Sequence, residues 1–281
     1  MTPIGNRPDL DASEVLDAVR EHYGLDGTMT PLTGDRDWNY LLLSDDGERH
    51  VVKVSSPDEP QDILEFETDM IARLSADTDG LIPALVASRS GSELVVLDGG
   101  EEPGLRIRVV DFLSGGLLAD VNPRSESLLV HVGARVAQLG SALGAYPDHP
   151  PARIDFDWAL GSAGAVMEKN VGLLTGSQRS LIESTLKTFR TNERDLLGLG
   201  SQIIHGDIND HNVLVSLDAS GAHRVSGVID LGDAHSAPRV FDLAIAVAYA
   251  ILGTNDPISA AAAVTRGYYE AQPLLDVEMR V

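Results

Sequence analysis

The chain has 281 residues, 43% of them hydrophobic, which suits one large domain or two lobes with separate cores. It carries 43 acidic against 21 basic side chains, and this formal charge of −22 argues against nucleic acid or an anionic membrane as its main partner. The sequence has no cysteine, which excludes disulfides, thiolate catalysis and cysteine-based metal sites.

The first third of the chain is predicted to form a sheet with two helices. Residues 11–25 predict a helix that Asp11 caps and Gly24 ends, because an apolar stripe lies between these two signals. A hairpin with an Asp-Gly turn is expected over 38–56, and a second helix over 57–77. Further strands with glycine turns are expected over 81–97 and 105–113.

The remainder is predicted to be mainly helical. Apolar periodicity indicates helices over 127–143, 177–198 and 241–252. We therefore expect an α+β fold, with a small sheet-rich lobe at 1–111 and a larger helical lobe at 112–281.

One stretch, "IIHGDINDHNVLV" at 203–215, places six polar residues between two apolar runs. A hairpin is expected directly after it, and this hairpin would bring Asn212 and Asp230 to the same end, beside the loop that carries Asp207. Amide and carboxylate oxygens suit Mg²⁺, and a further carboxylate that stays off the metal can accept a proton from an attacking hydroxyl. This layout is typical of kinase-like phosphoryl transfer.

The spacing His-Gly-Asp, four residues, Asn, followed by "VIDLGD", resembles the aminoglycoside phosphotransferase and choline kinase superfamily. The residues of the motif are most similar to those of its hydroxylysine-kinase-like branch. They also resemble the phosphotransferase module fused to class III aminotransferases in some bacterial proteins. The resemblance extends over about 30–252. It implies a bilobal protein-kinase-like fold, with a small antiparallel-sheet N-lobe that holds one helix and a larger, mainly helical C-lobe.

Carried over residue by residue, the resemblance makes Asp207 the catalytic base or the group that orients the hydroxyl. Asn212 and Asp230 would bind Mg²⁺. His205 would brace the catalytic loop, with help from Asp242. Asn209, Asp210 and His211 are expected to face outward or toward an acceptor.

The small lobe holds matching candidates. Lys53 lies in a strand of valines and would contact the α and β phosphates of the nucleotide. Glu67 falls within the apolar stripe of the second helix. Since a buried carboxylate needs a cation, we expect Glu67 to pair with Lys53. Glu65 is the alternative carboxylate for this pair. By analogy with the family, backbone groups near Asp111 to Leu113 would hold the adenine.

The resemblance implies transfer of the γ-phosphate of ATP, or GTP, to a hydroxyl of an amino alcohol or amino sugar, with Mg²⁺ as cofactor. A small cationic acceptor fits the acidic balance of the chain. The alternative is a non-catalytic kinase-like module that binds nucleotide or a metabolite and regulates a fused or partner enzyme. The presence of all five family residues, Lys53, Glu67, Asp207, Asn212 and Asp230, favours the enzyme.

The acceptor pocket is expected in the second lobe, where the sequence does not choose among Asp155, Asp157, Trp158, Glu168, Asp233 and His235. Residues 272–281 begin like a new helix and then stop, so we expect the natural protein to continue into further helices or domains. The N-terminus lacks the features of a signal peptide, and the apolar run at 240–252 is too short to span a bilayer; we expect a cytoplasmic protein.

Overall fold

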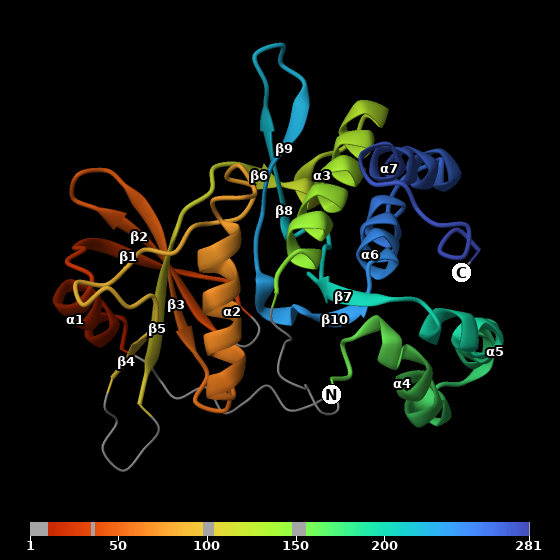
Figure 1. Ribbon diagram of the computed structural model, residues 1–281, viewed down its shortest axis with the longest axis horizontal. Coiled ribbons are helices and arrows are strands. Elements are labelled where there is room, and N and C mark those ends of the chain that lie inside the picture. Colours follow the sequence, from red (N-terminus) through yellow and green to blue (C-terminus); the bar gives the residue numbers. More distant parts are fainter. Residues whose placement is uncertain (1–10, 35–36, 98–103, 148–155, 281) are drawn as a thin grey trace. The chain divides into compact units, whose positions relative to one another are not determined.

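Two compact units make up the protein, whose computed structural model describes residues 11–34, 37–97, 104–147 and 156–280 (Figure 1). The first unit is Met1–Gly115 together with Ser226–Ile229, and the second is Gly116–Val225 together with Asp230–Val281. The sequence placed a lobe boundary after Asp111.

The first unit is built on a five-stranded antiparallel sheet of order β1-β2-β3-β5-β4. Its strands are β1 (Gly27–Leu32), β2 (Trp38–Ser44), β3 (Arg49–Ser55), β4 (Val95–Val96) and β5 (Arg106–Asp111). Its helices are α1 (Ala12–His22) and α2 (Gln61–Leu74).

Local signals in the sequence account for most of this unit. The Asp11 carboxylate accepts a hydrogen bond from the Ser13 amide at 2.9 Å and caps α1. Gly24 follows the helix with a φ of 73°, and Gly47 turns the β2–β3 hairpin with a φ of 90°. The predicted helices at 11–25 and 57–77 and the hairpin at 38–56 are confirmed.

The strands predicted with glycine turns over 81–97 form only in part. Only β4 and an isolated bridge between Leu85 and Val110 are paired there. Pro83 has no amide hydrogen for a ladder, and a turn closed by the Ser88 amide and the Ser92 carbonyl interrupts the run. The segment therefore follows β5 without forming a continuous strand.

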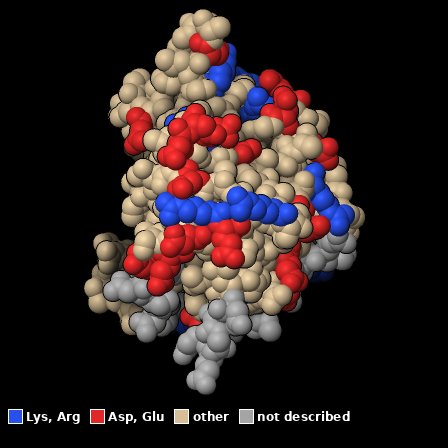
Figure 2. Space-filling view, turned by 90° about the vertical axis from the view of Figure 1, so that its left-hand side faces the viewer, with Lys and Arg blue, Asp and Glu red and all other residues tan. Residues whose placement is uncertain are grey.

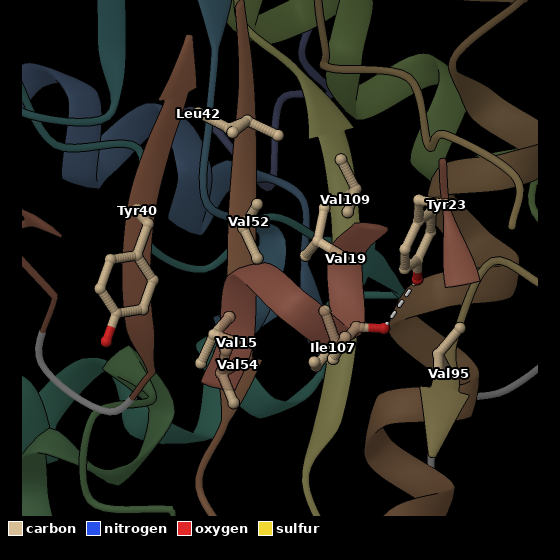
Figure 3. Packing of buried hydrophobic residues seen from close by; sticks show 11 residues of the cluster. Val15, Val19, Tyr23, Tyr40, Leu42, Val52, Val54, Val95, Ile107 and Val109 are labelled. Carbon is tan, nitrogen blue, oxygen red and sulfur yellow. Dashed lines mark hydrogen bonds between the residues drawn. The ribbon is translucent and has the colours of Figure 1, made fainter. Parts of the chain in front are cut away.

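The core of the first unit lies between α1 and one face of the sheet (Figure 3). Val15 and Val19 of α1, with Tyr23 directly after the helix, pack on residues that alternate along the strands, which are Tyr40, Leu42, Val52, Val54, Ile107 and Val109. The Tyr23 hydroxyl donates to the Ile107 carbonyl at 2.9 Å, and burial raises the pKa of Tyr23 to about 12. Residues between these strand positions point to the opposite face.

The second unit is mainly helical. Its helices are α3 (Glu126–Gly144), α4 (Ala163–Asn170), α5 (Gly176–Leu197), α6 (Val240–Ala250) and α7 (Pro257–Ala271), with short 3-10 turns at Leu118–Asp120, Leu160–Ser162, Val171–Leu173 and Leu231–Asp233. Its strands are β6 (Gly116–Leu117), β7 (Ser201–Ile204), β8 (Val213–Leu217), β9 (His223–Val228), whose end belongs to the first unit, and β10 (His235–Pro238). Antiparallel pairing of β10 with β7 and the order β6-β8-β9 form two small sheets. The helices expected at 127–143, 177–198 and 241–252 and the hairpin after residue 212 are confirmed, and so is the α+β class.

Helices α3 and α7 lie side by side in the second unit (Figure 1). A Cβ atom on Gly133 would come 1.9 Å from the Val264 carbonyl oxygen, and one on Gly267 equally close to that of Val130. The two backbones touch here, so only glycine fits at either position.

The C-terminal stretch does not continue as a helix. The Met279 amide donates to the Leu275 carbonyl in an isolated turn. Both carboxylate oxygens of Glu278 accept hydrogen bonds from Arg239, which stands just before α6. This ion pair anchors the segment that follows α7.

Acidic side chains are spread over the surface. The face in Figure 2 shows Asp and Glu on both sides of a narrow stripe of Lys and Arg. Arg20 illustrates the pattern, because it contacts both Asp17 and Asp26 at 2.7 Å. Within the described ranges, no helix is long and apolar enough to cross a membrane.

Candidate active site

The catalytic loop predicted from the motif connects β7 to β8 in the second unit. Gly206 has a φ of 82°, and a Cβ there would lie 2.6 Å from the Asp233 carbonyl oxygen and 2.8 Å from the His235 ring. Glycine is therefore required directly before Asp207.

Two asparagines hold the carboxylate of Asp207. Asn209 Nδ2 donates to one carboxylate oxygen at 2.8 Å, and Asn212 Nδ2 donates to the other at 2.9 Å. Asn212 Nδ2 also donates to the Asp207 carbonyl at 2.9 Å. Both bonds of Asn212 use the nitrogen, so its side-chain oxygen is the atom suited to a metal.

Asn209 is a site residue that the sequence reasoning did not assign. Its side-chain oxygen accepts from the amides of His211 and Asn212, which closes the loop in the manner of an Asx-turn. The signal was present, because Asn commonly bonds to amides two and three residues ahead.

Two buried side chains, Asp242 and His205, hold the backbone of the catalytic loop. The Asp242 carboxylate accepts from the amides of His205 and Gly206, both at 2.9 Å. His205 has no exposed surface, and its Nδ1 accepts from the Asp207 amide at 3.2 Å. Burial raises the pKa of Asp242. Together these hydrogen bonds fix the backbone amides of residues 205 to 207.

Electrostatics link Asp207 to two further carboxylates. Burial raises the pKa of Asp207, the hydrogen bond from Asn209 opposes the rise, and the charges of Asp233 and Asp230 add to it. Asp230 is exposed and adopts a left-handed conformation with a φ of 66°, which is strained for a residue with a side chain.

The donor set suits a hard cation only in part. In the portion of the chain that the structure describes, no three His, Cys, Asp or Glu side chains are arranged to hold a metal together. The Asn212 oxygen and the exposed Asp230 carboxylate are hard oxygen donors that leave coordination positions for water and phosphate. They fit Mg²⁺ better than a metal that prefers nitrogen or sulfur.

Asp210 does not face outward or toward an acceptor, as the sequence had suggested. Its carboxylate lies 2.6 Å from Arg124 Nη2, and its carbonyl accepts from the Ala119 amide. Arg124 also donates to the Tyr249 carbonyl at 2.8 Å. Asp210 is therefore a structural residue that ties the loop to the start of α3, while His211 is exposed.

Lys53 and Glu67 lie on the side of the sheet opposite the α1 core. Lys53 on β3 stands across from Asn39 of β2 and Arg108 of β5. Glu67 of α2 is buried, as predicted, and its Oε2 lies 2.9 Å from Arg108 Nη1. Glu65 is exposed and accepts a hydrogen bond from Gln61, which removes it as the buried carboxylate. The pairing of Glu67 with Lys53 stays a prediction.

Arg108 was missed, although arginines at alternate positions of the otherwise apolar run "RIRVV" were a signal. At the end of the same strand, the Asp111 amide donates to the Ala84 carbonyl and the Phe112 amide to the Arg49 carbonyl. Neither nitrogen is open to adenine, so Leu113 remains the predicted backbone donor.

A pocket of about 210 Å³ lies within the second unit. It is lined by residues of α5, β7, β10 and α6, among them Phe189, Glu193, Ser201, His235 and Phe241. The Nδ1 of His235 is 2.7 Å from the Asp233 carbonyl, which can only accept, so Nδ1 carries the proton. Nε2 is then a bare acceptor, buried and without a hydrogen-bond partner in the described residues. Of the other acceptor candidates, Asp157, Trp158 and Glu168 are exposed, and Asp155 lies outside the described residues.

The chain matches the family model of the phosphotransferase enzyme family over residues 28–276. It belongs to this family. It is 31% identical to the hydroxylysine kinase of Mus musculus over 275 residues, covering 89% of this chain and 71% of the mouse protein. It is 26% identical to the Danio rerio hydroxylysine kinase, covering 99% and 81% of the two chains.

Solved structures share the fold. A microcompartment-associated aminopropanol kinase superposes with a TM-score of 0.70 at 18% identity, covering 95% of this chain and 83% of the other. The amicoumacin kinase hAmiN, in complex with AMP-PNP, Ca²⁺ and amicoumacin, gives 0.71 at 15% identity, with 95% and 80% covered. The resemblance to the phosphotransferase superfamily and its hydroxylysine-kinase-like branch is confirmed, and so are the protein-kinase-like fold and the enzyme class, a phosphotransferase with an alcohol group as acceptor. The resemblance to a module fused to class III aminotransferases stays a prediction.

Proposed function

We propose that the protein transfers the γ-phosphate of ATP, or of GTP, to a hydroxyl of an amino alcohol or amino sugar, hydroxylysine-like or aminoglycoside-like. The observation that carries the proposal is the hydrogen-bonded carboxylate of Asp207, held at both oxygens by Asn209 and Asn212. The hydroxylysine kinases at up to 31% identity support the acceptor class.

In the proposed step, Asp207 accepts the proton of the acceptor hydroxyl. The acceptor oxygen bonds to the γ-phosphorus, the bond from that phosphorus to the bridging oxygen breaks, and the nucleoside diphosphate leaves with the electron pair. A carboxylate whose pKa is raised by burial is a better proton acceptor than an ordinary Asp. His205 and Asp242 keep the backbone of Asp207 in place during the step.

The nucleotide would be held mainly by the N-lobe at 1–111, and the acceptor by the C-lobe at 112–281. Lys53 would contact the α and β phosphates with Glu67 as its partner, and the backbone near Leu113 would hold the base. Asn212 and Asp230 would hold Mg²⁺, which neutralises charge on the phosphate oxygens when bound.

The pocket beside the catalytic loop suits the proposed acceptor class. The His235 ring lies against Gly206, next to the reacting carboxylate, and its Nε2 needs a hydrogen-bond donor. A hydroxyl or ammonium group of the acceptor would supply one, since a buried acceptor left unpaired costs stability.

The test is a nucleotide-consumption screen over amino alcohols, hydroxylysine and aminoglycosides, with Asp207→Asn measured beside the wild type. We expect turnover with one acceptor class, and a fall in kcat of about 10²–10⁴-fold in Asp207→Asn with nucleotide affinity retained. Full activity of the variant on a good substrate would refute the role of Asp207. Binding of ATP without turnover of any acceptor would favour a non-catalytic regulatory module.

A further inference from the structure

Arg108 is a buried cation beside Lys53, on the same face of the sheet. Arg108 is 1% exposed. Its strand neighbours Ile107 and Val109 belong to the core beneath α1, so Arg108 points to the opposite face. A guanidinium is almost never buried unless carboxylates or hydrogen bonds compensate for its lost hydration.

Two carboxylates from different elements compensate for this burial. Glu67 Oε2 of α2 lies 2.9 Å from Nη1, and Asp37 Oδ2 lies 3.6 Å from Nη2. Asp37 stands between β1 and β2, directly before Trp38. The planar fork of one arginine thus joins the helix to the turn that precedes β2, a geometry that a lysine cannot reproduce.

Register places this cluster around Lys53. Lys53 and Arg108 are direct partners across β3 and β5, so their side chains leave the same face at neighbouring positions. Two like charges side by side repel each other, and a carboxylate shared between them removes the repulsion. Glu67 already contacts Arg108 and is therefore placed to serve both cations.

We propose that Arg108 is a positioning residue for nucleotide binding. It fixes Glu67 and Asp37 around Lys53 and, among the described residues, keeps the charge of these four side chains balanced, with two cations against two anions. This inference rests on the proposed function, because Lys53 is taken to contact the phosphates. Without Arg108 the cluster would carry a net charge of −1 and repel the polyanionic nucleotide.

The experiment measures nucleotide affinity directly, by calorimetry with the non-hydrolysable analogue AMP-PNP, in the absence of acceptor. We expect Arg108→Met to raise the Kd for AMP-PNP about tenfold and to raise the KM for nucleotide by the same factor. The KM for acceptor should not change. The double variant Arg108→Met/Asp37→Asn restores the neutral charge of the cluster. Its Kd for AMP-PNP should be at least about threefold lower than that of Arg108→Met.

Arg106→Met is the matched control. Arg106 is a buried arginine on the same strand and the same face, but it donates to the carbonyls of Ser56 and Glu59 and not to the α2 carboxylate. We expect its Kd within about twofold of the wild type. Arg108→Lys keeps the charge and loses the fork, and should raise the Kd about threefold.

The proposal is overturned if Arg108→Met binds the nucleotide like the wild type or no worse than Arg106→Met, or if the double variant recovers nothing. Should Arg108→Met fail to fold, Arg108→Lys decides, and a wild-type Kd for that variant overturns the proposal. Because binding is measured without turnover, a wild type that binds AMP-PNP but phosphorylates no acceptor would reject the proposed function and leave this test intact.

Discussion

Asp207 is oriented before any substrate binds. Its two oxygens are held by Asn209 and Asn212, and its backbone is fixed through His205 and Asp242. Preorganised groups of this kind spend no energy on rearrangement during the reaction. Asn209 acts through Asp207, and it also lowers the pKa that burial raises.

Asn209→Ala should therefore reduce kcat by about tenfold and change its pH dependence. Loss of the hydrogen bond raises the pKa of Asp207 further. Since the base must be ionised, activity is lost as the pH falls through that pKa, so the acidic limb of kcat/KM should move to higher pH. Steady-state rates between pH 4.5 and 8 on the best acceptor measure both effects.

His211→Ala is the control for that variant, because His211 is exposed on the same loop. This variant should keep the wild-type kcat, and the acidic limb of its kcat/KM profile should lie at the same pH as in the wild type. An acidic limb that stays in place in Asn209→Ala would contradict the assignment of the Asn209 bond as a pKa-lowering contact.

The motif spacing was enough to predict which residues form the catalytic loop, but not which residues support it. Asp210 was predicted wrongly because its partner, Arg124, stands 86 residues earlier in the chain. Arg108 was missed for a similar reason, since α2 and β5 meet only in the folded sheet. Local spacing does not encode such long-range ion pairs, and a buried charge in an apolar strand is the one clue that the sequence offers.

At the scale of elements, the contact of α3 with α7 depends on the absence of side chains. Gly133 and Gly267 allow each helix to touch the backbone of the other. The sequence predicted α3 from its apolar period, and α7 also had start signals that were overlooked, namely the Asp256 cap and a proline in the first turn. Which glycines lie at the crossing could not be predicted, because a helix pattern gives no information on its neighbour.

Gly133→Ala should destabilise the protein, although alanine is the better helix former. The added methyl would meet the Val264 carbonyl, so we expect a loss of about 1–3 kcal/mol in the free energy of unfolding, measured by urea denaturation. Gly140→Ala, seven residues later in the same helix, is the control, since its nearest neighbour would be a Gln272 side-chain atom at 4.0 Å. There the helix propensity of alanine should add up to about 1 kcal/mol. A loss at both positions would argue against the close crossing.

Across the whole molecule, composition and periodicity were enough to predict the α+β class, the hairpins and five of the helices, α1, α2, α3, α5 and α6. They could not predict the conformation of the described residues that follow α7. There the sequence suggested a new helix, and the structure has a turn held by Arg239 and Glu278. Arg239 and Glu278 are 39 residues apart, so local spacing does not encode the bidentate ion pair that fixes this segment.

This ion pair makes the stability of the molecule depend on pH. The hydrogen bonds from Arg239 lower the pKa of Glu278 below its ordinary value of 4.5. A carboxylate whose pKa is lower in the folded than in the unfolded state stabilises the fold above the unfolded pKa. That stability is lost as the pH falls through the lower, folded-state pKa.

Arg239→Met should therefore cost about 1.5–3 kcal/mol of unfolding free energy at pH 7. The difference from the wild type should shrink as the pH falls through the lowered pKa of Glu278, and the bond from Arg239 to the Pro273 carbonyl should account for what remains. Urea denaturation at pH 7, 5 and 3.5 measures it. Arg266→Met removes an exposed pair with Glu126 and should stay within about 0.5 kcal/mol of the wild type throughout. A difference for Arg239→Met that does not change with pH would show that its contribution does not depend on the ionised Glu278.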